Sequence, residues 1–259
     1  MQLPVHYRGL MASIFQKLLK KQPRPASRQA ARGQSFLELA IVLPVILIML
    51  LGMVEVVVFI GRYLDVLDLT REAARFASVR DPFTISTGTA NCSDSNYYNF
   101  YYNTACVLSP PAGSASCTDS NYCNGLNPYV YINPATDDVI ISVYTVQIDS
   151  DVSAIHPVSG VWALSDHDAD TAHNGNWTKD CEGNVVRTAP YYTQARVQSQ
   201  MEAAESLPNR GYVAVEVFYC HAQVLGIPII SDFIDNPLQI HAYTIMSLPA
   251  AQPTPSPIP

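Results

Sequence analysis

The chain is poor in charged residues, and the few it has are unevenly divided. Charged side chains make up 14% of its 259 residues, against about 25% in a typical soluble domain. Residues 1–33 hold seven Lys and Arg residues and no acid, whereas the rest holds all 22 acids and eight basic residues. Because the basic leader ends directly before a long apolar run, this distribution disfavours nucleic-acid binding and favours attraction to anionic lipid.

The sequence also lacks the common catalytic and metal-binding motifs. No GxSxG, HExxH or P-loop pattern occurs, and the six histidines are scattered. No CxxC pair occurs either, and the Cys117–Cys123 spacing suits zinc poorly, so zinc is the weaker alternative for the cysteines. We therefore predict a protein that is not an enzyme.

One apolar run is long enough to cross a membrane. Ala40–Val54 contains no charged residue, and Val56–Ile60 extends the run. A helix from Ser35 to Ile60 would measure about 39 Å, more than the roughly 30 Å hydrocarbon core of a bilayer. The preceding basic residues place the N-terminus in the cytoplasm. We predict a single-pass protein of the cytoplasmic (inner) membrane with an extracytoplasmic C-terminal domain.

A cleaved secretory signal is the alternative interpretation of this run. It fits less well, because the run is long for a signal sequence and no small-residue cleavage site follows it.

The cysteines agree with the predicted orientation, since none precedes the apolar run. They are Cys92, Cys106, Cys117, Cys123, Cys181 and Cys220. An even number in an exported domain predicts disulfides, although six cysteines allow 15 pairings. We expect local bridges among the first four and a Cys181–Cys220 link.

The helix is expected to continue beyond the membrane. Val66, Leu69, Ala73 and Ala77 recur at helical spacing. Asp81-Pro82 ends the pattern, because a residue before proline disfavours the α conformation. A single helix from near Ser35 to near Arg80 follows, half in lipid and half outside.

Later segments predict a small antiparallel sheet. Period-two alternation marks strands at 138–149, 211–220 and 238–246, with one covered face and Glu216 pointing outward. A helix is expected at 193–206. The apolar connector Leu225–Pro237 should tuck in or touch the bilayer surface.

The predicted fold class is α+β, with a long N-terminal transmembrane helix, a small antiparallel sheet and a disulfide-rich insertion. Its parts are a basic cytoplasmic leader (1–33), a transmembrane and juxtamembrane helix (34–80), an extracytoplasmic domain (81–248) with a loop-rich insertion (83–136), and a proline-rich tail (249–259).

The best metal candidate is an acidic loop, "SDHDADTAHNGNW". Asp166, Asp168 and Asp170 alternate there, as oxygen ligands do in calcium loops. Thr171 and Trp177 stand where an EF-hand needs glycine and glutamate, which excludes that motif. An irregular calcium site and a solvated acidic loop both stay open; no other cofactor is expected.

Two glutamates, Glu38 and Glu55, lie in the apolar stretch. A cut after Gly33 would make Gln34 the first residue and Glu38 the fifth. This arrangement resembles the type IV prepilin processing signal, in which a peptidase cuts on the cytoplasmic side. The resemblance implies that the glutamate pairs with the new terminal ammonium of an adjacent subunit. A membrane carboxylate costs less when paired, and a helix N-terminus favours negative charge.

The wider stretch "RGQSFLELAIVLPVILIMLLGMVEVVVFIGRYLDVLDLTREAARFAS" resembles the N-terminal signature of the TadE-like family of pilus-assembly pseudopilins. The matching features are Gly33-Gln34-Ser35, Glu38, Leu43-Pro44, Leu51-Gly52, Glu55, Gly61-Arg62 and Glu72–Ala77. The resemblance covers roughly residues 32–80 and 211–247, and leaves out the cysteine-rich insertion.

This resemblance implies a non-catalytic, membrane-anchored pilin-like subunit of a Tad/Flp pilus or related secretion apparatus. Its implied partners are the lipid bilayer, other pilin-like or Tad secretion subunits, and a prepilin peptidase. Small residues permit close helix approach, so we expect helix pairing at Glu55, Arg62, Ala73, Ala74 and Ala77, with Arg62 or a partner helix as the companion of Glu55. The alternative is a membrane-anchored binding module for calcium, glycan or surface contact, built on residues 83–181.

Overall fold

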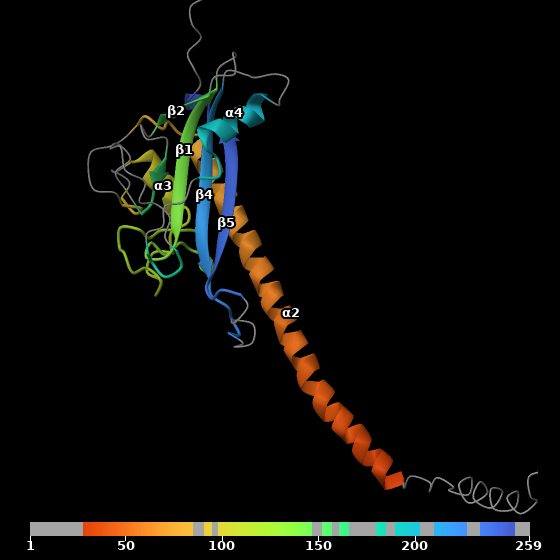
Figure 1. The fold of residues 1–259 in the computed structure, drawn as a ribbon. Helices are drawn as coiled ribbons and strands as arrows, with labels where there is room; N and C mark the ends of the chain where they lie inside the picture. The colour runs from red at the N-terminus through yellow and green to blue at the C-terminus, as the bar shows by residue number, and fades with distance from the viewer. Residues whose placement is uncertain are drawn as a thin grey trace, which may run out of the picture. The chain divides into compact units, whose positions relative to one another are not determined.

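The protein divides into two compact units, Met1–Met53 and Val54–Pro259, and each is described by itself. In the computed structural model the described residues are 28–84, 91–94, 98–146, 152–156, 161–165, 180–184, 190–202, 210–226 and 234–251. Figure 1 shows the order of the elements along the chain.

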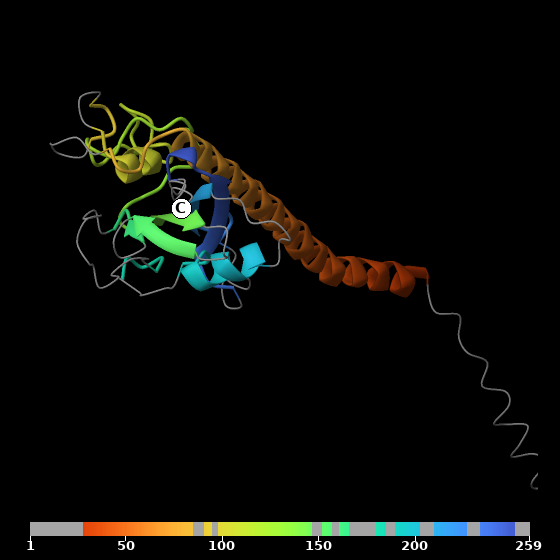
Figure 2. The same ribbon diagram turned by 90° about the horizontal axis from the view of Figure 1, so that it is seen from above.

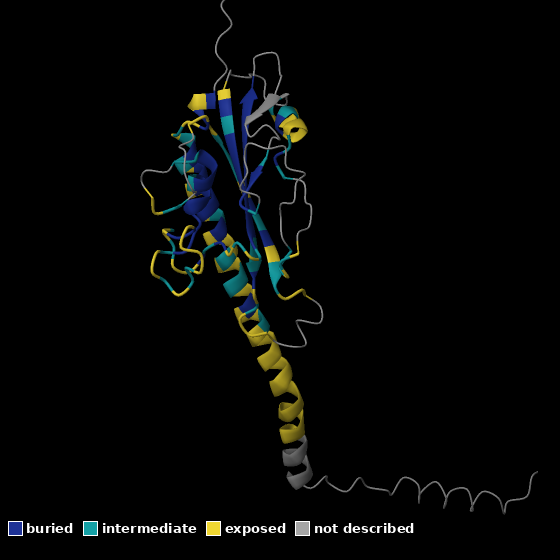
Figure 3. Ribbon diagram, turned by 90° about the vertical axis from the view of Figure 1, so that its left-hand side faces the viewer, coloured by how far each residue is buried: buried dark blue, intermediate teal, exposed yellow. Residues whose placement is uncertain are grey.

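The helix α2 runs from Arg28 to Ser78 and enters both units. It ends close to the predicted position but begins seven residues before the predicted start at Ser35. In the first unit, every side chain described from residue 35 to 53 is exposed except at Gly52 (Figure 3). Pro44 lies inside the helix, a position that membrane helices tolerate.

The second unit is built on an antiparallel sheet of five strands. They are β1 (Asp138–Val146), β2 (Val152–His156), β3 (Trp162–Ala163), β4 (Arg210–His221) and β5 (Leu238–Ser247). Their order is β2-β1-β4-β5, and β3 also pairs with β1. The α+β fold and its three predicted strands are confirmed, whereas β2 and β3 were not predicted.

The second-unit part of α2 covers one face of this sheet. Its buried side chains include Val66, Leu69, Ala73 and Ala77, which belong to the same core as Val215 of β4. This is the apolar stripe that the sequence predicted. The opposite side of the helix is charged and exposed.

The short helix α3 (Phe100–Cys106) adds to the same core. The Asn99 side chain caps it by accepting the backbone N–H groups of Tyr101 and Tyr102, each at 3.0 Å. Phe100 and Tyr101 are fully buried. The insertion was predicted to be loop-rich, and α3 is the regular element within it that periodicity over so few residues did not reveal.

The other face of the sheet is also covered, which corrects the prediction of a single covered face. The helix α4 (Gln194–Glu202) and the segment before it lie on this side (Figure 2). Tyr144 and Val146 of β1 pack there with Tyr192 and Val197. Glu216, predicted to point outward into solvent, is only 1% exposed because this second layer lies over it.

The C-terminal segment begins as part of the fold rather than as an extended tail. Pro249–Ala251 form the 3-10 helix η1, and Ala251 is buried. A Cβ at Gly211 of β4 would lie 2.3 Å from the carbonyl oxygen of Leu248. Only glycine therefore allows η1 to pack this closely against β4. Residues 252–259 lie outside the described part of the chain.

Candidate functional site

The apolar half of α2 is the first functional feature. Within the described residues, one helix is long and apolar enough by length and composition to cross a membrane, namely Ser35–Ser78 of α2. Phe36, Met49 and Met53 are each at least 65% exposed. Such a run of exposed apolar side chains is costly in water and favourable in lipid, and it supports membrane anchoring.

Glu38 lies on the exposed surface of this half of α2, at the start of the apolar run. It is ten residues beyond the first residue of the helix, Arg28. Because a helix dipole acts mainly on the first turn, the dipole argument for Glu38 does not hold for the uncut chain; it would require a helix that begins near Gln34. Gly33 and Gln34 lie within α2, and their side chains are not among those described.

Glu55 has a different environment, inside the second unit. Its side chain is 9% exposed. One carboxylate oxygen accepts the backbone N–H of Val224 at 2.7 Å, and the other accepts that of Leu225 at 3.0 Å. Both donors belong to the connector that follows β4. Glu55 therefore fastens this connector to α2, and pairing of Glu55 with Arg62 or a partner helix stays a prediction.

We call the two hydrogen bonds from Val224 and Leu225 to the Glu55 carboxylate the Glu55 clasp. His221, at the end of β4, lies beside it. It is 5% exposed, and its Nε2 atom has no hydrogen-bond partner. Its ring centroid is 5.8 Å from that of Phe59 on α2. Burial lowers the pKa of His221, with the nearby Glu55 charge opposing the shift and Arg62 adding to it. The imidazole thus forms part of the packing around the Glu55 carboxylate.

The remaining residues predicted for helix pairing are also used within the chain. Arg62 donates from Nη1 to the carbonyl oxygen of Tyr129 at 2.6 Å, which ties α2 to the insertion. Ala73, Ala74 and Ala77 are fully buried in the core of the second unit. The surface predicted to pair with another subunit's helix at these alanines is therefore covered by this chain's own core, and their pairing with another subunit stays a prediction.

All six cysteines are paired. The disulfides are Cys92–Cys106, Cys117–Cys123 and Cys181–Cys220. This pairing agrees with the expected local bridges and the Cys181–Cys220 link.

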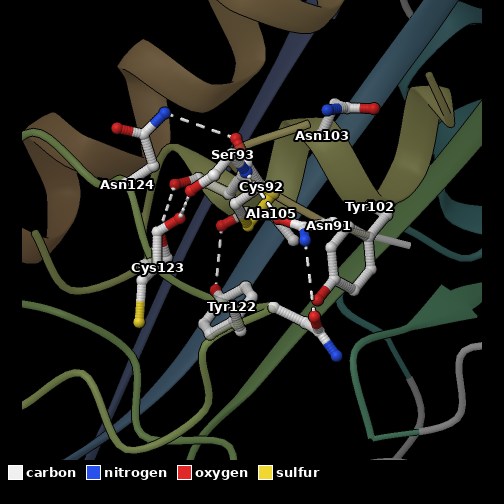
Figure 4. Close-up of a disulfide and its surroundings, with 12 residues drawn as sticks. Asn91, Cys92, Ser93, Tyr102, Asn103, Ala105, Tyr122, Cys123 and Asn124 are labelled. Carbon is white, nitrogen blue, oxygen red and sulfur yellow. Dashed lines mark hydrogen bonds between the residues drawn. A yellow bond between two sulfur atoms is a disulfide. The ribbon is translucent and has the colours of Figure 1, made fainter. Parts of the chain in front are cut away.

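The first disulfide fastens the start of the insertion to α3, and hydrogen bonds join each of these segments to Asn121 and Tyr122 (Figure 4). The Tyr122 hydroxyl donates to the carbonyl oxygen of Ala105 at 2.8 Å. The backbone N–H of Cys92 donates to the carbonyl oxygen of Asn121 at 2.8 Å. Burial raises the pKa of the Tyr122 phenol well above its usual value. The insertion is therefore an ordered, cross-linked layer in its described parts.

The insertion also contains a cavity of about 300 Å³. Asp119, Tyr131 and Asn133 contribute polar groups to its lining, and Pro110 and Ile132 contribute apolar surface. This volume lies at the lower end of the range for small-molecule sites, roughly 300–1,000 Å³.

Glu216 is a buried carboxylate whose environment the sequence did not predict. It accepts the backbone N–H groups of Tyr191 at 2.7 Å and Tyr192 at 2.8 Å, and its Oε2 lies 3.0 Å from Nε2 of His241. Tyr191 in turn stacks on Tyr243, with ring centroids 3.8 Å apart. The one available signal was an acidic residue in the middle of a valine-rich strand.

The acidic candidates for calcium, Asp166, Asp168 and Asp170, lie outside the described residues. Among the residues that are described, no group of three or more His, Cys, Asp or Glu side chains is arranged to hold a metal ion.

The comparisons with known proteins bear on α2. Residues 33–75 match the family model of TadE-like protein. The resemblance found in the sequence is thereby confirmed over this segment, which includes Glu38, Glu55, Ala73 and Ala74. A TadE-like match implies a Tad pilus-related role of the pseudopilin type. No curated protein and no solved structure matched the chain.

Proposed function

We propose that this protein is a membrane-anchored, pilin-like subunit of a Tad/Flp pilus or related secretion apparatus, with a structural rather than catalytic role. The TadE-like match at residues 33–75 carries the proposal, because it falls on a helix whose first half is apolar and exposed. The N-terminus would lie in the cytoplasm and the sheet domain outside the inner membrane, since the basic leader precedes the span.

In this proposal, assembly takes place through the exposed half of α2. The described side chains of residues 35–53 are exposed apart from Gly52, whereas Ala73 and Ala77 are buried in the core of the second unit. Helices in lipid associate through close packing and polar contacts rather than through the hydrophobic effect. A carboxylate at Glu38 is the group in this segment best suited to bind a cation of a neighbouring subunit, such as a new terminal ammonium.

The test is assembly of a Glu38→Gln variant in cells that carry the complete secretion apparatus. We expect the variant to reach the membrane and form its disulfides, but to lose co-purification with pilin-like chains. Glu72→Gln, an exposed change on the outer part of the same helix, should co-purify like the unchanged protein. Normal assembly of the Glu38→Gln variant would overturn the proposed mechanism.

Processing is tested separately by the intact mass of the membrane-extracted protein. Loss of residues 1–33 would show that a prepilin peptidase cuts after Gly33. A full-length mass would show an uncut anchor, and the Glu38 carboxylate would then have no terminal ammonium to bind.

A second candidate function rests on the cavity in the insertion. Its hydroxyl, amide and carboxylate groups beside tyrosine and proline fit a small polar ligand, in line with a membrane-anchored binding module. Titration of the detergent-extracted protein with monosaccharides, followed by tyrosine fluorescence, tests this function. Saturable binding that Tyr131→Ala removes would favour the binding function. A titration without any fluorescence change would refute it and leave the pilus role as the only proposed function.

A further inference from the structure

The connector after β4 exposes aliphatic side chains at the site where it is fastened to α2. Val224 is 63% exposed, Leu225 39% and Ile234 47%. The sequence from Ala222 to Ser231 contains no charged residue. Exposed aliphatic side chains such as Val224 and Leu225, on a stretch without charge, are typical of an interaction surface rather than of a loop in water.

The turns of α2 next to Glu55 expose similar side chains. Val56 is 56% exposed, Val57 68% and Ile60 50%. These residues directly continue the apolar sequence of the candidate span. The connector, through Glu55, is therefore held at the level of α2 where the apolar run comes to its end.

The Glu55 clasp also makes the connector suitable for an environment with little water. Backbone N–H groups that lack water need a partner within the protein. The Glu55 carboxylate supplies that partner to Val224 and Leu225. In exchange, the two N–H groups satisfy a carboxylate that would otherwise be costly close to lipid.

We infer that Val224, Leu225 and Ile234, in the described parts of the connector, form a second membrane contact and insert into the interfacial layer of the bilayer that α2 crosses. This inference rests on the proposed membrane anchoring. The contact is monotopic: it dips into the headgroup region and does not span. It holds the sheet domain against the membrane surface, so that the domain has a defined orientation for its neighbours in the assembly.

Lipid is the occupant that the observations favour over a protein partner. The exposed side chains are aliphatic, whereas tyrosine, tryptophan and arginine are the residues that most often anchor protein interfaces. The connector is also hydrogen-bonded to Glu55, whose exposed neighbours Val56 and Val57 belong to the helix that is apolar enough to lie in lipid.

The experiment places an environment-sensitive label on the connector of the full chain. Because all six native cysteines are paired, a single introduced cysteine can be labelled with a nitrobenzoxadiazole group. The labelled Val224→Cys and Ile234→Cys proteins are reconstituted into vesicles of phosphatidylcholine and phosphatidylglycerol, with and without lipids that carry a nitroxide quencher. Leu47→Cys reports on the span. Ser199→Cys, at an exposed position on α4, is the matched control for a label that stays in contact with water.

We expect blue-shifted emission and loss of fluorescence to shallow nitroxides at positions 224 and 234, loss to deep nitroxides at position 47, and no loss at position 199. Water-like, unquenched emission at 224 and 234 together with quenching at 47 would overturn the inference and leave the membrane anchor intact. Absence of quenching at position 47 would refute the anchor itself. Cross-linking between two copies at position 224, without quenching, would assign the surface to a second copy and also overturn the inference.

Discussion

At the scale of residues, buried carboxylates that accept backbone N–H groups recur in this fold. Glu55 and Glu216 each receive two consecutive N–H groups from a segment far away in sequence. Asp137 accepts those of Asn133 and Cys220. A charged acceptor forms stronger hydrogen bonds than a neutral one, and at Glu55 and Glu216 it fixes irregular segments that have no sheet or helix partner of their own.

Glu216→Ala tests the value of one such clasp. The change leaves two buried N–H donors and His241 without their acceptor, and an unsatisfied buried donor costs roughly 1–3 kcal/mol. We expect the free energy of unfolding to fall by about 3 kcal/mol in total, measured by urea denaturation in detergent. Glu216→Gln keeps one acceptor oxygen and should lose less. A loss no larger than that of the exposed change Glu182→Gln would contradict this role.

Asp137 should make stability depend on pH. Burial, opposed by the N–H groups of Asn133 and Cys220, raises the pKa of its carboxyl from 3.8 to about 6. The folded state therefore binds more protons than the unfolded state between these values, so stability falls as pH rises. Such a shift corresponds to about 3 kcal/mol.

The measurement compares unfolding of the unchanged protein with that of Asp137→Asn from pH 3 to pH 7. The free energy of unfolding of the unchanged protein should decrease relative to that of Asp137→Asn as pH increases through this window. Parallel curves would show that Asp137 does not titrate in it.

At the scale of elements, the disulfides differ in the length of chain that they close. Cys181–Cys220 has a sequence separation of 39 and Cys117–Cys123 one of 6. Loop-closure entropy predicts stabilisation of about 4 kcal/mol for the first and about 2 kcal/mol for the second. The longer bridge also fixes its loop to the end of β4, next to the connector.

Replacing each pair by serine should reproduce this order. We expect the Cys181→Ser/Cys220→Ser protein to unfold at a lower urea concentration than the Cys117→Ser/Cys123→Ser protein, with circular dichroism as the readout. The reverse order would indicate that the short bridge holds a larger part of the core.

The alanines of α2 belong to the same scale, because they decide how closely the helix approaches its sheet. Ala74→Leu adds volume where the side chain is fully buried, and overpacking of this kind costs typically 1–3 kcal/mol. Thermal unfolding in detergent should show the loss, whereas Glu72→Leu on the exposed side should show little. Unchanged stability with lost assembly would instead support the pairing with another subunit that the sequence predicts for these alanines.

At the scale of the whole molecule, the two glutamates of α2 should separate into two functions. Glu55→Ala leaves two connector N–H groups without an acceptor and should lower the free energy of unfolding by about 2 kcal/mol. Glu38→Gln changes an exposed residue of the first unit and should leave folding unchanged. Differential scanning calorimetry of both variants measures this difference. Equal destabilisation of the two variants would refute the claim that Glu55 serves folding and Glu38 does not.

The amino-acid sequence by itself determined the membrane-type helix, the positions of three strands, the Cys181–Cys220 link and the TadE-like segment, whereas the structure decided how the first four cysteines pair. Partition of a helix into lipid depends on a sum over its side chains, and the period of a strand or helix depends on near neighbours. Both quantities can be read along a chain. For the same reason, the run of residues 35–53 and the stripe through Val66 and Ala73 were predicted correctly.

Only the tertiary structure decided what Glu55, Glu216 and the alanines contact. Glu55 meets residues about 170 positions away, and Glu216 meets residues about 25 positions away. A carboxylate in an apolar segment is equally compatible with a neighbouring subunit, an arginine on the same helix or a distant backbone. The choice among them depends on which segment folding brings within 3 Å, and no local pattern in the sequence contains that information.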